Sequence, residues 1–311
     1  MLQKTKNEIK AGIHKARIYR NTHGKNKFIN RTHGKKYGCI VLAGYKKILW
    51  DSVFPRLYKY IPDNIDVLVV SSGLFDTDLK KICEEYNWSY LSTKKNNLCL
   101  AQNLAIKSLP EAEYIFKLDE DMFVTRGFFE DMIQKYNSVS EKGRYDIGFV
   151  APLIPINGYC YIKLLERFGE LERFESVFGK AKYTCGNHDK KNFTKDPKIP
   201  PYLWSQTNML KDIDATAEML RTDADDYSVC PFRFSIGAIF FKRKIWTDMG
   251  MFDVNHTTGM ALDEIKLCQY CNTNSLAIIV SHNSFVGHLA YGPQMDSMIE
   301  YYKANKHQFL A

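Results

Sequence analysis

The chain has 311 residues, of which 45% are hydrophobic and 14% aromatic, and its formal net charge is +8. This apolar content is enough for a buried core and excludes intrinsic disorder for most of the chain. No stretch approaches the roughly 18 apolar residues of a membrane span, no signal peptide is recognisable, and eight scattered cysteines do not make a disulfide framework. We therefore expect a reduced, cytoplasmic protein.

The positive charge is concentrated at the N-terminus. Residues 1–36 contain eleven Lys or Arg and one acid, Glu8, so this segment carries +10, whereas the other 275 residues carry −2. We expect a basic arm over 1–36 that is either a solvated, partly mobile segment or a surface for anionic lipid headgroups or another polyanion. The second role predicts a peripheral position at the inner face of the membrane. Nucleic acid is disfavoured as a partner, because only Tyr19 and Phe28 are there to stack on bases.

From Tyr37 onward, short β-rich runs alternate with helical stretches. In chain order we predict a strand at 39–43, a helix from Asp51 or Ser52 with Pro55 in its first turn, a strand at 66–70, a helix from Thr77, a strand at 88–91, a helix at 99–108 and a strand at 114–118. This succession predicts an α/β domain over 37–311 with a mixed, mostly parallel sheet flanked by helices. In such sheets ligands bind at the carboxyl ends of the strands.

Residues 155–232 interrupt this pattern with aromatic side chains and polar runs such as 187–192. We predict an irregular insertion on the acceptor side, with helices at 160–171 and 211–222. Its aromatic rings either form a platform for a sugar or pack the insertion's own small core. The α/β pattern then resumes with a strand at 236–241, a helix at 262–272, a strand at 276–280 and a helix at 293–306.

Asp119 and Asp121 follow the strand at 114–118 and flank a single residue. Alternate side chains of an extended segment point the same way, so both carboxylates are expected to face one pocket. Two like charges that close together require a cation, and oxygen ligands favour Mg²⁺ or Mn²⁺ over Zn²⁺. The alternative is a solvated acidic turn that caps the next helix. The preceding apolar strand favours the metal site.

The segment Tyr114–Met122 resembles the Asp-x-Asp segment of GT-A glycosyltransferases, particularly those of family 2. Other segments resemble family landmarks in matching order. They are the nucleotide-contacting strand at 67–73, the Ala101-Gln102-Asn103 that opens a helix, the acceptor-side stretch at 235–252, and 262–268, where the family carries a Glu-Asp pair. The resemblance covers 37–290 apart from 155–232, and it implies a GT-A, Rossmann-like fold.

The resemblance also implies an activity. It implies metal-dependent transfer of a sugar from a nucleotide-diphosphate sugar, with a UDP-sugar favoured, to a hydroxyl of a glycan or lipid-linked acceptor in surface polysaccharide synthesis. Asp119 and Asp121 would hold Mn²⁺ or Mg²⁺ at the leaving diphosphate. The expected donor contacts come from Ser71, Ser72, Asn103 and Asp119. Serines stand where the family usually has Asp, and Gln102 replaces an Arg. Uncharged groups would therefore form hydrogen bonds with the nucleotide base or ribose of the donor.

An inverting displacement is expected, and it needs a base for the acceptor hydroxyl. Asp263 and Glu264 are both candidates, because the family's order of Glu and Asp is reversed here. The alternative is that neither residue is a base and that the acidic pair only complements the dipole of the helix. His288 lies where many GT-A enzymes have a third metal ligand, and His282 is the second choice. Either is otherwise an ordinary hydrogen-bonded histidine.

Two other functions remain open. A nucleotidyltransferase would use Lys46 and Lys47 on a triphosphate, and a non-catalytic module would bind a polyanion through the basic arm and keep a relict nucleotide-sugar site. Cys268 and Cys271 are predicted to be buried helix residues, because a structural zinc site needs four ligands.

Overall fold

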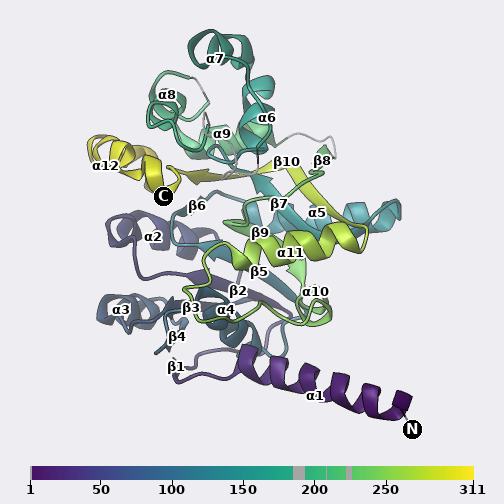
Figure 1. Ribbon diagram of the computed structural model, residues 1–311. Helices are drawn as coiled ribbons and strands as arrows, with labels where there is room; N and C mark the ends of the chain where they lie inside the picture. The colour runs from purple at the N-terminus through teal and green to yellow at the C-terminus, as the bar shows by residue number, and fades with distance from the viewer. Residues whose placement is uncertain (1, 185–192, 208, 222–225) are drawn as a thin grey trace. The chain divides into compact units, whose positions relative to one another are not determined.

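The computed structural model describes residues 2–184, 193–207, 209–221 and 226–311, so the predicted polar run at 187–192 lies outside the described residues. The chain divides into two compact units (Figure 1). Unit 1 comprises Met1–Tyr45, Asp63–Phe116 and Lys242–Tyr270, and unit 2 comprises Lys46–Pro62, Lys117–Phe241 and Cys271–Ala311. The chain passes from unit 1 to unit 2 within the predicted strand that precedes the acidic run, β5 (Tyr114–Asp119).

Unit 1 contains a sheet with the strand order β1-β4-β3-β2. Its strands are β1 (Asn26–Ile29), β2 (Tyr37–Leu42), β3 (Ile65–Ser72) and β4 (Ser89–Thr93). β2, β3 and β4 pair in parallel, whereas β1 pairs antiparallel with β4. All eight residues of β3 are buried, which is the pattern of a strand covered on both faces.

The helices of unit 1 are α1 (Leu2–Thr22), α3 (Thr77–Glu85), α4 (Leu98–Lys107), α10 (Arg243–Asp248) and most of α11 (Leu262–Thr273), whose last three residues belong to unit 2. Asp76 caps α3, because its carboxylate accepts hydrogen bonds from the backbone N–H groups of Asp78 and Leu79. The helix predicted from Thr77 begins at that residue, and its capping side chain is Asp76.

The basic segment at the N-terminus is joined to unit 1 by the end of α1. Asn21 is fully buried, and its side-chain oxygen accepts a hydrogen bond of 3.1 Å from the backbone N–H of Val254. Arg17 forms an ion pair of 2.7 Å with Asp253. Residues 1–36 are thus grouped with the rest of unit 1. Among the described residues, none of the helices combines the length and the apolar character that crossing a bilayer requires.

Unit 2 contains the strand order β9-β7-β10-β6, with β8 paired to β10. Its strands are β6 (Met122–Val124), β7 (Asp146–Leu153), β8 (Tyr227–Val229), β9 (Ala238–Lys242) and β10 (Leu276–His288). β7 and β10 pair in parallel along the longest ladder of this unit, and the other pairs are antiparallel. The predicted α/β class with a mixed sheet flanked by helices is confirmed.

Several helices of unit 2 lie within the predicted insertion. They are η1 (Lys47–Leu49), α2 (Trp50–Tyr60), α5 (Phe128–Lys142), α6 (Cys160–Arg167), α7 (Leu171–Phe178), α8 (Ile199–Ser205), α9 (Ile213–Leu220), η2 (Gly292–Gln294), α12 (Met295–Ala304) and η3 (Lys306–Phe309). Because η1 leads directly into α2, Pro55 lies in the second turn of α2. The prediction that it lies in the first turn was wrong.

The rings of the insertion pack against one another. Phe174 of α7 contacts Tyr161 of α6 and Tyr202 of α8, with centroid distances of 5.8 and 6.1 Å. Figure 1 shows these short helices gathered in one part of unit 2. The aromatic residues of the insertion were expected either to form a platform for a sugar or to pack a small core within the insertion. These contacts match the small core.

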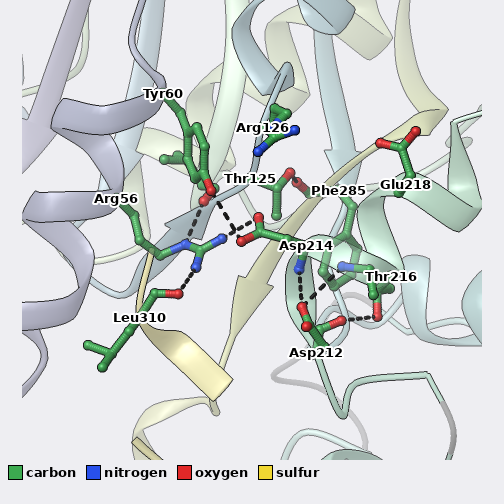
Figure 2. A network of polar contacts seen from close by, with 12 residues as sticks. Arg56, Tyr60, Thr125, Arg126, Asp212, Asp214, Thr216, Glu218, Phe285 and Leu310 are labelled. Carbon is green, nitrogen blue, oxygen red and sulfur yellow. Dashed lines mark hydrogen bonds and ion pairs between the residues drawn. The ribbon is translucent and has the colours of Figure 1, made fainter. Parts of the chain in front are cut away.

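A buried arginine joins three separate segments of unit 2 (Figure 2). Arg56 of α2 donates through Nε to the Val124 carbonyl of β6 at 2.8 Å and through Nη1 to the Leu310 carbonyl at 2.6 Å. Its Nη2 pairs with Asp214 of α9, which also accepts a hydrogen bond of 3.2 Å from the Tyr60 hydroxyl. Arg56 thereby fixes β6, which directly follows the acidic run 119–121.

Replacing Arg56 by Met should lower the free energy of unfolding by about 2–3 kcal/mol, because it leaves the buried Val124 carbonyl, the part-buried Leu310 carbonyl and one carboxylate without this donor. The loss stays below that of a fully buried pair, since Asp214 remains partly hydrated. Urea denaturation of Arg56→Met beside Arg144→Met, at an exposed position of the same residue type, measures the difference. Equal stabilities of the two variants would contradict this role.

Candidate functional site

The acidic run 119–121 lies where β5 turns into β6. β5 ends at Asp119 and β6 begins at Met122, so Glu120 and Asp121 form the turn and the run is not extended throughout. The middle residue, Glu120, is buried and accepts a hydrogen bond of 2.6 Å from the Trp50 indole N–H. Asp119 and Asp121 have different hydrogen-bond partners, Lys117 and Lys46, while the Lys46 ammonium is attracted by all three acids. One pocket shared by both carboxylates stays a prediction.

Asp121 is buried between two cationic groups. Its Oδ2 accepts a hydrogen bond from the Lys46 ammonium and lies 3.3 Å from Nε2 of His288. Lys46 stands at the start of η1, two residues after Gly44, whose φ of +146° is one that residues with side chains rarely adopt. His288 ends β10 and lies opposite Met122 in the antiparallel ladder with β6. The pairing of β10 with β6 therefore brings His288 to Asp121.

The charges around Asp121 decide its ionisation. Burial by itself would raise the pKa of the Asp121 carboxyl, but the charges and hydrogen bonds of His288 and Lys46 outweigh it and hold the pKa well below its usual range. For the Lys46 ammonium, burial favours the neutral form and Asp121 favours the charged one. The pKa of Lys46 lies above its ordinary value. Asp121 is thus an ionised carboxylate beside a charged lysine.

The orientation of His288 fits a metal ligand. Its Nδ1 lies 3.0 Å from the Ile156 carbonyl oxygen, which can only accept, so Nδ1 carries a hydrogen. This contact fixes the ring with Nε2 facing the Asp121 carboxylate at 3.3 Å. A histidine whose second nitrogen donates to a backbone carbonyl is the usual arrangement of a metal ligand. The pair Asp121 and His288 therefore fits a divalent ion.

Asp119 is held by a different cation. Its Oδ1 accepts a hydrogen bond of 2.6 Å from the buried Lys117, which also donates to the Ile236 carbonyl at 2.8 Å. Within the described part of the chain, no three His, Cys, Asp or Glu side chains are grouped to hold a metal ion. The structure thus brings together two of the three predicted metal ligands, Asp121 and His288, and pairs the third, Asp119, with Lys117.

His282, the second choice for a metal ligand, belongs to another cluster. Its Nδ1 lies 3.0 Å from Asp226, and its Nε2 lies 2.8 Å from the Ser228 hydroxyl. These partners come from β8 and the residue before it, so His282 is an ordinary hydrogen-bonded histidine. The predicted strand at 276–280 extends to His288 as β10, which is why one strand carries both histidines.

The serines at the end of β3 use their hydroxyls within unit 1. Ser71 donates to the Leu74 carbonyl at 2.7 Å and lies 2.8 Å from the Tyr90 hydroxyl. Ser72 donates to the Asn96 side chain at 3.2 Å. Both serines are buried. These contacts stabilise the loop after β3, and a role in donor binding remains a prediction.

Asn103 has a structural role that was not predicted. It is fully buried in α4, and its amide nitrogen donates to the Asn21 and Phe252 carbonyls, both at 2.8 Å. Its oxygen accepts hydrogen bonds from the Trp246 indole at 2.9 Å and from the Phe252 backbone at 3.0 Å. All of its donors and both lone pairs are used. These contacts give Asn103 a structural role, and its contact with the donor stays a prediction.

The candidate bases lie in the first turn of α11. Asp263 is buried, and its Oδ2 accepts a hydrogen bond of 2.7 Å from the amide of Gln102, a residue of α4. Glu264 is half-buried. Gln102, which replaces the family's Arg, therefore positions Asp263 within unit 1, and Glu264 is the more accessible of the two carboxylates.

Lys46 and Lys117 are the residues of the site whose roles were not predicted. Lys46 was considered only for a triphosphate, and Lys117 was treated as part of a strand. One signal was present in the sequence, since Lys117 and Asp119 are two residues apart and so share a face of β5. The partner of Lys46 is 75 residues away, a separation at which spacing gives no signal.

Similarity to known proteins was examined at the level of sequence and of structure. No model of a protein family and no curated protein sequence matches the chain. Among solved structures, the chain is similar to S. aureus TarS, with a TM-score of 0.46 and 12% identity over 88% of this chain and 41% of that chain. It also covers 65% of the structure of TarS 1–349, so it spans about half to two thirds of these chains.

Two further structures are similar over most of the chain. One is the mannosyltransferase PcManGT from Pyrobaculum calidifontis in complex with GDP-Man and Mn²⁺, with a TM-score of 0.46 and 13% identity over 96% of this chain and 67% of that chain. The other is glucosyl-3-phosphoglycerate synthase from Mycobacterium tuberculosis in complex with Mn²⁺, UDP and glucosyl-3-phosphoglycerate. Its TM-score is 0.44 and its sequence identity 10%, over 89% of this chain and 80% of that chain.

The role of Asn103 can be tested by substitution. Asn103→Ala should lower the free energy of unfolding by about 3 kcal/mol, because it leaves four buried partners without a hydrogen bond. It should leave Mn²⁺ binding unchanged. Asn137→Ala, at an exposed position of α5, is the matched control. A stable Asn103→Ala protein with weakened nucleotide binding would instead support the predicted donor contact.

Proposed function

We propose that the chain is a metal-dependent glycosyltransferase that moves a sugar from a nucleotide-diphosphate sugar to a hydroxyl of an acceptor. The observation that supports this most directly is the buried Asp121 beside His288, at the end of β5, with an ionised carboxylate and an imidazole nitrogen 3.3 Å apart. A buried carboxylate requires a cation, and here the Lys46 ammonium supplies it. The pair follows a strand in an α/β unit, where ligands of this fold class bind.

Asp121 and His288 would hold the metal, and Asp119 is the third candidate ligand. A carboxylate and an imidazole together suit Mn²⁺, and Mg²⁺ is the alternative when carboxylates dominate the ligand set. The ion supplies Lewis-acid stabilisation of the departing nucleotide diphosphate. The chain's own contribution is to fix His288 through the Ile156 carbonyl and to keep Asp121 ionised in a buried position.

An inverting transfer also needs a base that takes the proton of the acceptor hydroxyl. We favour Glu264, because it is half-buried, whereas Asp263 is buried and bonded to Gln102. Loss of transfer with retained donor binding in Glu264→Gln, beside smaller losses in Asp263→Asn, would identify Glu264 as the base. The reverse order would assign the role to Asp263.

The donor is proposed to be a UDP-sugar, and a donor screen tests this together with the metal. In a thermal-shift assay, wild type should be stabilised by one nucleotide-diphosphate sugar with Mn²⁺, by about 2.7 kcal/mol at a hundredfold excess over Kd. Asp121→Ala should lose this effect, because the site loses the carboxylate that anchors the ion. A shift with nucleoside triphosphates alone would indicate a nucleotidyltransferase. No shift with any nucleotide would favour the polyanion-binding module.

The acceptor is proposed to be a glycan or lipid-linked glycan of surface polysaccharide synthesis, and α1 is proposed to hold the enzyme at an anionic membrane. This helix contains six Lys or Arg and one acid, while Ile9, Ile13 and Tyr19 are exposed. Ile9 and Ile13 are four residues apart and share one face. An apolar face bordered by basic residues is typical of helices that lie in the headgroup region.

Sedimentation with vesicles tests this contact without disturbing the fold. Replacing Lys4, Lys6 and Lys10 by Gln should lower the bound fraction on phosphatidylglycerol-containing vesicles, because each basic residue near such a surface contributes about 1 kcal/mol. The control replaces the exposed Lys59, Lys107 and Lys180, which have the same total charge. Equal binding of both triple variants would exclude α1 as the contact.

A further inference from the structure

The ammonium of Lys46 lies where a metal ion would bind Asp121. Its Nζ donates to Oδ2 of Asp121, the same oxygen that lies 3.3 Å from Nε2 of His288. A divalent ion held by Asp121 and His288 and the ammonium of Lys46 therefore require the same carboxylate oxygen. The two cations compete for this oxygen and repel each other beside it.

Lys46 can leave Asp121, whereas Lys117 is fixed. The side chain of Lys46 is 35% exposed while that of Asp121 is 3% exposed, so the ammonium approaches from the solvent side. Lys117 is buried, and its Nζ is held by the Ile236 carbonyl as well as by Asp119. Lys117 thus keeps a second partner if Asp119 is taken by a metal, whereas Lys46 is held at Asp121 by its partly exposed side chain.

The charges of the site favour this exchange. Lys46 is attracted by Asp119 and Glu120 as well as by Asp121, and Lys117 already neutralises Asp119. When a divalent ion joins Asp121, the region gains two positive charges and the attraction that holds Lys46 is largely cancelled. An ammonium released next to a bound ion is then available for an anion, and a donor's diphosphate is the anion that this site is proposed to take.

We propose that Lys46 exchanges partners during donor binding: it neutralises Asp121 in the metal-free protein, and when the metal binds it turns to the diphosphate of the donor. This inference rests on the proposed function and adds the residue that would bind the diphosphate. Lys46 is suited to the task, since an ammonium on a flexible stem binds phosphate oxygens as a mobile point charge. Because binding equilibria are reciprocal, the metal and the diphosphate would each promote binding of the other through Lys46.

The exchange predicts opposite effects of one substitution on two ligands. Lys46→Met keeps the length of the side chain and removes its charge. Without donor, it should tighten Mn²⁺ binding roughly tenfold, because the competing ammonium is absent. With saturating Mn²⁺, it should weaken binding of UDP and of inorganic pyrophosphate roughly tenfold, because the diphosphate loses its cation.

Two titrations measure these effects without any transfer reaction. Free Mn²⁺ is followed by electron paramagnetic resonance in the absence of nucleotide, and UDP and pyrophosphate are titrated by calorimetry at saturating Mn²⁺. Lys47→Met is the matched control, because Lys47 is the next residue of the same type and its ammonium lies 5.4 Å from the Trp50 ring centroid. It should change neither affinity.

The outcomes separate this inference from the proposed function. Tighter Mn²⁺ binding together with weaker diphosphate binding in Lys46→Met supports the exchange. Weaker binding of both ligands would make Lys46 a structural residue, and unchanged affinities would show that Lys46 contacts neither ligand. Either result would overturn the inference and leave the proposed metal site intact. If wild type and Asp121→Asn bind Mn²⁺ equally, or if neither binds it, the proposed function is overturned and this inference with it.

Discussion

A buried carboxylate needs compensating positive charge, and in unit 2 this requirement falls on Asp121. An ionised carboxylate in an apolar interior is destabilised by several kcal/mol unless cations and donors surround it. Lys46 and His288 meet that need from opposite ends of the sequence, and the Ile156 carbonyl after β7 fixes the ring of His288. The turn after β5 and the ends of β7 and β10 thus all contribute to one charged cluster.

The scaffold around this cluster limits its movement. β6 follows Asp121 directly and pairs with the end of β10 that carries His288, and the buried Arg56 ties β6 to α2 and α9. Thr125, just after β6, donates to the Phe285 carbonyl of β10 at 2.7 Å. The backbone beside Asp121 is therefore held on both sides, while the side chain of Lys46 remains the partly exposed element. A rigid carboxylate and imidazole with one mobile ammonium suit a site that must admit an ion and an anion in turn.

Local patterns predicted much of the fold and part of the site. The apolar runs at 39–43, 66–70 and 114–118 became β2, β3 and β5, because a buried strand is recognisable from its own residues. Asp121 and His288 were found from their places after strands and from the family resemblance. Long-range partners were not predictable. The hydrogen bonds of Asn103 reach Asn21 and Phe252, which are 82 and 149 residues away, and no local pattern distinguishes a structural amide from one that binds a ligand. The turn at 119–121 was missed because an alternation rule applies only while the chain stays extended.

The central claim is that Asp121 and His288 share a metal ion which displaces Lys46. Anomalous diffraction from a crystal soaked in Mn²⁺ and UDP tests it most directly, because it locates the ion and shows the side chains in the same experiment. The account predicts an anomalous peak within bonding distance of an Asp121 carboxylate oxygen and of Nε2 of His288, with the Lys46 ammonium moved from Asp121 to the diphosphate. A peak at other residues, or UDP bound while Lys46 stays on Asp121 and no ion lies at His288, would contradict it.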